Sequence, residues 1–458
     1  MQRRRVPARP QHRRADRRPD RWHRDLDRRF DRRPCGARLT LTPDLAEALR
    51  TAARRYGTPA CVTDLATLDA ACATVRDAFP APIVHQYSVK ANDVPAIIAA
   101  VAARGFGANV VSRGEWALAR RAGVPNARTT LEGVGKTPAD LRAAARAAAA
   151  GDPLRWVALE SPEEAADLAH AVRAAGAPPL DVLYRLNPDV APETLAGLAV
   201  GAGASKFGMT ETEIATAIAA GGGPDGPLRP RGIHLHVGSQ LGAIDAWRDA
   251  VRKALAVTAL WRGSIVTFDT VDLGGGFPVV AEGELAPTPG RFGRELPRLL
   301  EAVPVDRRPT RLAIEPGRAL VARSGWLVAR VLHVRERAGR QVVLDAGMTE
   351  LIRPALYGAR HPVVALSTLG RPVRAPGGPG ALEPARVEGP ICESTDALGT
   401  HDLPPLQRGD LVAIADAGAY GASLGSTYNG RPRPPQVLRD LDGTLRIGRR
   451  RGSLAGLG

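Results

Sequence analysis

The feature that most constrains this chain is a regular alternation of short apolar runs with alanine-rich amphipathic stretches between about residues 67 and 318. The apolar runs read as strands, and the stretches between them, such as PADLRAAARAAAA, read as helices. Eight strand–helix repeats over about 250 residues match the length and rhythm of a (β/α)8 TIM barrel. We therefore predict an α/β fold with a barrel over residues 67–318. The strand candidates are IVHQYSV, GANVV, TTLEGV, RWVALE, DVLYRLN, GIHLHVG, TVDLGGG and RLAIEPG.

A doubly wound parallel sheet is the alternative fold, because it also alternates strands with helices. Its dinucleotide-binding fingerprint, G-x-G-x-x-G, is missing from the sequence. In GAGASK, Gly201 and Gly203 are followed by Lys206 where the third glycine would stand. The barrel is therefore the preferred prediction.

The rhythm changes after Glu315, where strand-like runs continue but helical stretches become scarce. This change predicts a separate all-β domain, barrel-like or sandwich-like, over residues 319–458. The segment 39–66 holds one helix and the short strand ACVTD, which we expect to associate with the β domain. The C-terminal strand candidates are WLVARVLHVRE, QVVLDAG, PVVALS, ARVEGPIC and DLVAIADAG.

The net charge of +16 is concentrated at the N-terminus. Residues 1–38 contain 15 arginines against 5 aspartates, which leaves a surplus of only +6 on the rest of the chain. A segment so rich in charge buries too little apolar surface to offset its ordering entropy. We therefore expect a disordered extension rather than an RNA-binding or targeting arm, and no nucleic-acid partner.

The sequence shows neither a membrane span nor a secretory signal. It has no run of about 18 apolar residues, and its arginine-rich start lacks the apolar core of a signal peptide. Cys35, Cys61, Cys72 and Cys392 form no CxxC pair and no regular spacing. We therefore expect free thiols, a reducing cytoplasmic location and no membrane partner.

Lysine is scarce, with only four among the 63 basic residues. A lysine that forms an imine needs to stand at a strand end and face a pocket. Lys90, in HQYSVKAND, ends the first predicted barrel strand, on the rim where such barrels carry catalytic groups. Lys136, in GVGKT, resembles a phosphate-binding loop, but Thr130 occupies the position of the first glycine of that motif. Lys206 is a possible rim residue, and Lys253 belongs to a predicted helix, where it would be solvated.

His234 and His236, in GIHLHVGSQ, stand two residues apart and would lie on the same face of a strand. Three readings remain open from the spacing alone. The pair is structural and buried, or it is a metal-binding HxH, or a flat imidazole stacks on an aromatic cofactor beside Ser239. Metal is the least favoured reading, because no further His–carboxylate set falls at neighbouring strand ends. We predict no metal site.

The triple glycine in DLGGGFP follows the seventh predicted strand and forms either a tight turn or a cradle of amides for a phosphate. Loops after strands seven and eight of such barrels often hold a phosphate. The next strand end, EPGR, adds Glu315 and Arg318. Arg318 can pair with an anion, whereas Glu315 fits there if it neutralises a cation such as a protonated ring nitrogen. Together with an imine-forming lysine and a stacking histidine, these groups indicate pyridoxal phosphate.

The chain resembles the fold-type III pyridoxal-phosphate decarboxylases, and within them the diaminopimelate decarboxylase group. The matching segments follow the order of the family over about residues 56–438. They are YSVKAN, GVGKT, RLNPDV, SKFGM, HLHVGSQL, LGGGF, EPGRALVA, DAGMTELIRPALYGARHP, GPICESTD and DAGAYGASLGSTYNGRPRP. The first 38 residues lie outside the resemblance.

The resemblance implies a role for each matching position. Lys90 corresponds to the lysine that carries the cofactor, His236 to the histidine on its ring, and Glu315 to the acid at its ring nitrogen. The implied phosphate contacts are Ser239, Gly274, Gly275, Gly276, Arg318 and Tyr428. The implied substrate contacts are Arg318, Arg353, Tyr357 and Glu393, with Cys392 as a second catalytic residue beside Lys90.

The implied activity is decarboxylation of meso-2,6-diaminopimelate to L-lysine in a cytoplasmic homodimer. In such a dimer Cys392 and Glu393 reach the active site of the partner subunit. The alternatives are a paralogue that decarboxylates another carboxylated amino acid in secondary metabolism, and a non-catalytic cofactor-binding homologue. An amino-acid racemase fits less well, because CESTD and IRPALY follow the decarboxylase pattern. Ser88 and Thr395 depart from residues usual in the family and bear on the substrate.

Overall fold

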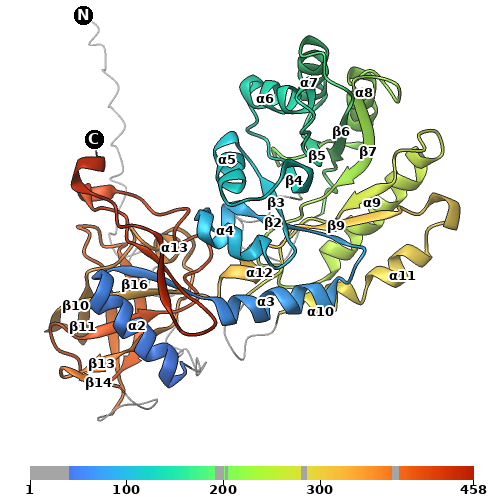
Figure 1. Ribbon diagram of the computed structural model, residues 1–458. Helices are drawn as coiled ribbons and strands as arrows, with labels where there is room; N and C mark the ends of the chain where they lie inside the picture. Colours follow the sequence, from blue (N-terminus) through green and yellow to red (C-terminus); the bar gives the residue numbers. More distant parts are fainter. Residues whose placement is uncertain (1–40, 191–200, 202–204, 280–285, 374–380, 458) are drawn as a thin grey trace, which may run out of the picture.

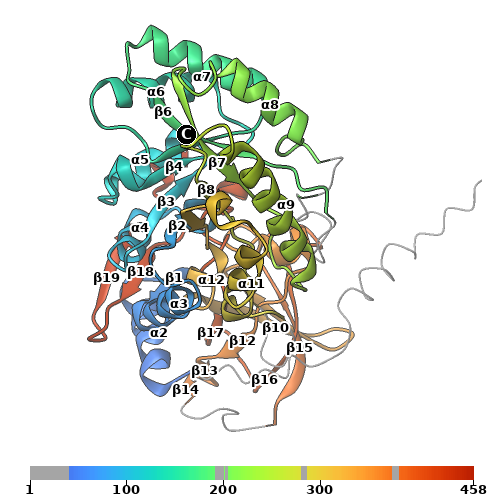
Figure 2. The ribbon, with the colours of Figure 1, turned by 90° about the vertical axis from the view of Figure 1, so that its right-hand side faces the viewer.

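The computed structural model describes residues 41–190, 201, 205–279, 286–373 and 381–457. In both views of Figures 1 and 2 these residues form two lobes that lie side by side. One lobe is a closed barrel, and the other is built on a mixed β-sheet. The disordered extension expected over residues 1–38 lies outside the described residues.

The first lobe is a closed barrel of eight parallel strands in sequence order, which confirms the predicted fold class. The ring closes where β2 pairs with β9, with Val84 opposite Ala313 and His85 opposite Ile314. Each of the eight predicted runs overlaps one strand, although β7 begins four residues before its run and β6 one residue before. The strands are β2 (Val84–Ser88), β3 (Gly107–Val110), β4 (Thr129–Leu131), β5 (Trp156–Leu159), β6 (Leu180–Arg185), β7 (Leu228–His234), β8 (Thr270–Asp272) and β9 (Arg311–Ile314).

Helices surround the barrel, and several begin at a side-chain cap. Ser112, Thr137, Ser161 and Thr210 each accept a hydrogen bond from the backbone N–H three residues further on. These caps satisfy amides that the first turn leaves unpaired, and so fix where each loop from a strand end becomes helix. The helices are α3 (Leu65–Ala78), α4 (Pro95–Ala102), α5 (Arg113–Arg121), α6 (Pro138–Ala149), α7 (Pro162–Ala174), α8 (Glu211–Ala220), α9 (Asp245–Arg262), α10 (Pro289–Gly293), α11 (Leu296–Glu301) and α12 (Arg318–Val321).

The second lobe contains a sheet whose main path runs β16-β15-β11-β10-β1-β18-β19, with β17 pairing with both β10 and β12. Its strand β1 (Ala60–Asp64) comes from before the barrel and pairs antiparallel with β10 and parallel with β18. The helix α2 (Pro43–Tyr56) buries Leu45 and Leu49 in a cluster with Trp326 and Val328 of β10. The remaining elements are β10 (Gly325–Glu336), β11 (Arg340–Leu344), α13 (Arg353–Tyr357), β12 (Val363–Ala365), β13 (Ser367–Thr368), β14 (Arg371–Pro372), β15 (Glu383–Glu388), β16 (Ala397–Leu403), β17 (Leu411–Ile414), β18 (Gln436–Arg439) and β19 (Leu445–Arg449).

The lobes meet at the rim formed by the carboxyl ends of the barrel strands. The Tyr420 N–H donates to the Ala91 carbonyl at 2.7 Å, and the Asn92 side chain donates to the Gly418 carbonyl at 2.9 Å. Loops of the sheet lobe therefore lie against the edge of the barrel on which a site is expected. Within the described parts of the chain, no helix combines the length and apolarity needed to cross a membrane.

Candidate active site

Charged groups converge at the carboxyl ends of four barrel strands. Lys90 lies in a 3₁₀ turn, η1 (Val89–Ala91), directly after β2. Glu132 follows β4, His234 ends β7, and Glu315 follows β9. The last three side chains are buried, whereas that of Lys90 is 35 % exposed. Because all strands of a barrel end on one rim, residues distant in sequence become neighbours there.

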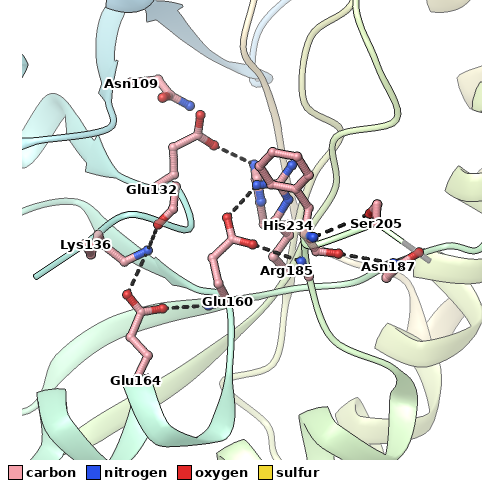
Figure 3. Close-up of polar contacts among 12 residues, drawn as sticks. Asn109, Glu132, Lys136, Glu160, Glu164, Arg185, Asn187, Ser205 and His234 are labelled. Carbon is pink, nitrogen blue, oxygen red and sulfur yellow. Dashed lines mark hydrogen bonds and ion pairs between the residues drawn. The ribbon is translucent and has the colours of Figure 1, made fainter. Parts of the chain in front are cut away.

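These groups form a continuous chain of polar contacts. Lys90 Nζ donates to Glu132 Oε1 at 3.3 Å. Glu132 Oε2 lies 2.9 Å from His234 Nε2, and the same nitrogen lies 3.2 Å from Glu315 Oε2. Asn109, on β3, donates to the other oxygen of Glu315. One imidazole edge therefore faces two buried carboxylates, and Figure 3 shows Glu132 and His234 turned toward each other.

Burial and proximity shift the protonation of these groups. Burial opposes the charge of His234, but Glu315 and Glu132 outweigh it and raise the pKa of the ring to about 10. Burial would raise the pKa of Glu132, yet Lys90 and His234 hold it well below its usual range. Burial, and then Glu132, raises the pKa of Glu315. Burial, and then Glu315, raises the pKa of Asp272 on β8 well above its usual range. At neutral pH the site therefore holds an ionised Glu132 between two cations.

The triple glycine packs closely between the segments that follow β7 and β9. A Cβ on Gly274 would lie 2.2 Å from the Leu235 carbonyl oxygen. The corresponding distances are 2.4 Å from Gly275 to the Glu315 oxygen and 2.4 Å from Gly276 to the Gly238 oxygen. Gly274 and Gly276 also have positive φ angles of 66° and 96°. Only glycine fits this segment, and its backbone amides carry no side chain beside them.

His236 lies two residues beyond the end of β7 rather than within the strand. The Gly275 N–H donates to His236 Nδ1 at 3.5 Å, which places the ring beside the glycine segment. Burial, and then Lys90, lowers the pKa of His236 well below its usual range. The ring is therefore neutral, unlike that of His234.

Two buried arginines lie at the same rim, and neither has a carboxylate partner among the described residues. Arg318 opens α12, donates to Ser239 Oγ at 3.2 Å and stacks 4.8 Å from the centre of the Tyr420 ring. Arg353 opens α13, and its Nη1 donates to His361 Nε2 at 2.8 Å. In the part of the chain that the structure describes, the Nε atoms of both arginines lack a hydrogen-bond partner.

The two guanidinium groups influence each other. Burial, and then Arg318, lowers the pKa of Arg353 to about 10. Tyr420 and Tyr357 act in the opposite direction on both arginines. Two desolvated cations with unused donors form a site for an anion, because a carboxylate or phosphate would balance their charge.

The other three lysines make different contacts. The side chain of Lys136 is fully buried, lies 2.9 Å from Glu164 Oε1 and donates to the Gly133 carbonyl at 2.6 Å, as Figure 3 shows. Its role is structural, which agrees with the rejection of a phosphate-binding loop. Lys206 stacks 5.3 Å from the centre of the Phe207 ring, and Lys253 is partly exposed, 4.0 Å from Glu211. Of the four lysines, all within the described residues, only Lys90 contacts Glu132, a buried acid of the rim.

A second group of predicted residues lies exposed on the sheet lobe. The Tyr428 hydroxyl donates to Glu393 Oε1 at 2.8 Å, and the Asn429 amide donates to Cys392 Sγ at 3.6 Å. Tyr428 is 47 % exposed, and Cys392 is exposed as well. Among the described residues of one chain, no hydrogen bond joins this group to Lys90 or Arg318. Its predicted part in the site therefore stays a prediction.

Sequence reasoning missed several residues of the rim. Glu132, Asn109 and Arg185 were given no role there, yet each is a polar residue within one residue of the carboxyl end of a barrel strand. That position was the available signal. Arg185 ends β6, pairs with Glu160 and stacks 4.7 Å from the centre of the Phe207 ring. Tyr420, left without a role, lies against Arg318.

The nitrogen and oxygen atoms of Glu132, His234 and Glu315 lie within 4.8 Å of one another, a spacing that a metal ion would also require. Lys90 and the His234 N–H already balance these carboxylates. The contacts are therefore accounted for by ion pairs, and we assign no metal to them.

Known proteins resemble this chain over most of its length. A family model described as "Pyridoxal-dependent decarboxylase, pyridoxal binding domain" matches residues 65–322. The diaminopimelate decarboxylase of Deinococcus radiodurans is 36 % identical over 392 residues, which cover 85 % of this chain and 92 % of the relative. That of Neisseria meningitidis serogroup B is 35 % identical over 417 residues, covering 90 % and 93 %.

Solved structures show the same likeness. The diaminopimelate decarboxylase of M. jannaschii in complex with L-lysine has a TM-score of 0.80 at 28 % identity, covering 90 % of this chain and 93 % of that one. The Helicobacter pylori diaminopimelate decarboxylase complexed with L-lysine has a TM-score of 0.78 at 28 % identity, covering 89 % and 98 %.

Proposed function

The chain belongs to the pyridoxal-dependent decarboxylases, within the diaminopimelate decarboxylase family, and from this premise we propose that it converts meso-2,6-diaminopimelate to L-lysine and carbon dioxide. The observation that carries the substrate is the pair of buried arginines, Arg318 and Arg353, with unused donors. A substrate that retains a carboxylate at its far end balances these cations. Ornithine or lysine would present an ammonium there instead and leave the arginines uncompensated.

The residues of the rim fit pyridoxal phosphate. A primary amine at Lys90 can form the reversible covalent link, which a guanidinium cannot. The glycine segment, into which no Cβ fits, lets a phosphate approach its backbone closely. The buried, unpartnered Arg318 Nε adds a donor for an anion. The residues that would hold the cofactor are Lys90, His236, Ser239, Gly274, Gly275, Gly276, Glu315, Arg318 and Tyr428.

The cofactor, when bound, supplies the electron sink for the carbon that loses carbon dioxide. Lys90 holds the reacting group at the mouth of the barrel. Glu315, kept in place by Asn109, would balance the charge of a protonated ring nitrogen. Arg318, Arg353 and Tyr357 orient the substrate by its retained carboxylate, so that the other carboxylate is the one lost.

We further propose a homodimer with shared active sites. Cys392 and Glu393 are exposed on the sheet lobe, where a second copy of the chain can bring them to the rim of its neighbour. In this arrangement the partner subunit's Cys392 donates the proton that replaces the departing carboxylate, and the partner subunit's Glu393 contacts the substrate. We propose that the N-terminal segment spans residues 39–66, the barrel residues 67–318 and the β domain residues 319–458. The free thiols of Cys61, Cys72 and Cys392 fit a cytoplasmic location.

The test compares wild type with Lys90→Ala, using Lys253→Ala as a control lysine on α9. We expect wild type and the control to show the visible absorbance of the lysine-bound cofactor and to release carbon dioxide from diaminopimelate. Lys90→Ala should show neither. Release of carbon dioxide from ornithine or lysine but not from diaminopimelate would contradict the substrate assignment. An unchanged spectrum in Lys90→Ala would contradict the role of Lys90.

A further inference from the structure

We propose that Glu132 is a positioning residue of this reaction, which serves as the counter-charge of Lys90 and, through its ion pair with His234, links the charge of Lys90 to that of Glu315. The inference rests on the proposed function, in that Lys90 is taken to carry the cofactor. It adds a residue that no motif in the sequence points to.

The contacts of Glu132 differ from those of two other acids near the rim, Glu115 and Glu160. Glu115 accepts the Val111 backbone N–H at 2.9 Å, and Glu160 accepts that of Gly208 at 2.9 Å. Among the described residues, Glu132 receives no backbone N–H. Its oxygens instead lie 3.3 Å from Lys90 Nζ and 2.9 Å from His234 Nε2. The partners of Glu132 are therefore two titratable side chains, which is not the pattern of an acid that only holds a loop.

The barrel contains a structural lysine, Lys136, and a lysine that can be released from its ion pair, Lys90. Lys136 pairs with the partly buried Glu164, has a side chain with no exposure, and also donates to a backbone carbonyl. The Lys90 side chain is 35 % exposed and has Glu132 as its hydrogen-bond partner in the described chain. One ion pair at an open rim holds Lys90, so its nitrogen can leave Glu132 without breaking a second hydrogen bond among the described residues.

The loss of that ion pair has consequences for His234 and Glu315. A buried carboxylate is costly unless a positive charge balances it. When the Lys90 nitrogen is committed elsewhere, His234 is the remaining cation in contact with Glu132. The His234 ring, which hydrogen-bonds to Glu315 and forms an ion pair with Glu132, is then drawn toward Glu132. Glu315 can then accept a hydrogen bond from another donor. A change in the charge of Lys90 thus alters the hydrogen bonding of Glu315.

The expected pH effect follows from the charges around Lys90. Glu132, Glu315 and Tyr420 favour its ammonium form, whereas burial and Arg185 oppose it. Glu115 and His236 also face Lys90. The amine attacks an aldehyde only after it loses its proton. Removing the negative charge of Glu132 therefore lowers the pKa of Lys90 and makes the amine reactive at lower pH. An opposite charge at this distance shifts a pKa by about 1–3 units.

The experiment mixes cofactor-free enzyme with pyridoxal phosphate and measures, as a function of pH, the rate at which the visible absorbance appears. In Glu132→Gln we expect the midpoint of this profile to fall by about one unit or more relative to wild type. Glu132→Asp keeps the charge and should return the midpoint toward wild type. Glu164→Gln removes the charge of the matched buried Lys–Glu pair and should leave the midpoint unchanged.

A Glu132→Gln midpoint equal to that of wild type would overturn the proposal. If that variant does not fold, histidine-selective NMR on wild type and Lys90→Ala decides instead, and nine histidines keep the spectrum tractable. We expect the His234 pKa to rise in Lys90→Ala, because Glu132 then loses one of the cations that balance it and interacts more strongly with His234, and an unchanged pKa would overturn the proposal. If wild type forms no visible band at all, the proposed function fails rather than this inference.

Discussion

Arg353 illustrates how one residue limits the choice of substrate. Its guanidinium is buried, donates to His361, and is repelled by Arg318. His361 accepts as a neutral ring, because burial and then Arg353 lower its pKa to about 3. Asp416 favours the charge of Arg353 from a distance, but among the described residues no carboxylate forms an ion pair with it, and a substrate carboxylate would supply that partner.

Replacing Arg353 with methionine should therefore raise KM for diaminopimelate while the absorbance of the bound cofactor persists. A lost hydrogen bond to a charged group costs about 1.5–3 kcal/mol, or roughly a 10- to 100-fold loss in kcat/KM. Steady-state kinetics measure the effect. Arg335→Met, at an exposed position of β10, is the matched control and should behave as wild type. An unchanged KM in Arg353→Met would remove this residue from the substrate site.

The residues of the site were predictable to different degrees. Lys90, Glu315, Arg318 and the glycines stand in recognisable motifs. Glu132 does not, because a glutamate after a short apolar run reads like a solvated one. Only the closure of the barrel places β4 where Glu132 meets Lys90 and His234. Ser88 shows the same limit: it is buried and donates to the Glu315 carbonyl at 3.0 Å, a contact that the sequence cannot reveal.

At the scale of elements, the segment after β8 depends on glycine for its path. Gly276→Ala introduces a Cβ at φ +96° that would lie 2.4 Å from the Gly238 oxygen. Because the glycine segment must then move away from the segment after β7, we expect the Kd for pyridoxal phosphate to rise by about tenfold or more. Fluorescence titration of the cofactor measures this change.

Gly105 provides a matched control for that substitution. It has the same φ of +96°, but a Cβ there would meet nothing within 4 Å. Gly105→Ala should carry a similar backbone cost of about 1–2 kcal/mol without a change in cofactor affinity. Equal affinities in the two variants would show that the close approach at Gly276 is not required for binding.

Strands were predictable where burial is continuous or regularly alternates. The barrel strands are buried on both faces and read as apolar runs. The strands β16, β18 and β19 were missed for a physical reason. β16 (ALGTHDL) buries few of its side chains, β18 has four residues, and β19 (LRIGR) is mostly exposed. Pairing with distant partners, rather than local sequence, stabilises these strands.

For the whole molecule, shared active sites make a prediction about mixed dimers. Lys90→Ala and Cys392→Ala should each be strongly impaired alone. After dissociation and re-association in equal amounts, half the dimers are mixed and each mixed dimer has one intact site. Activity should then recover to about a quarter of wild type. Absence of recovery, with mixed dimers demonstrated by two affinity tags, would contradict a site built from both subunits.

The pairing of β1 has a consequence for how the chain is made. Asp64, at the end of β1, accepts from Arg439 on β18 across 375 residues of sequence, and the whole barrel is encoded between them. During synthesis on the ribosome, most barrel strands can pair with the next strand to emerge. One edge of β1, by contrast, stays unpaired until β18 has been made. A chain that terminates before β18 therefore keeps one edge of β1 unpaired beside a complete barrel. Such an open strand edge can pair with another chain and promotes aggregation.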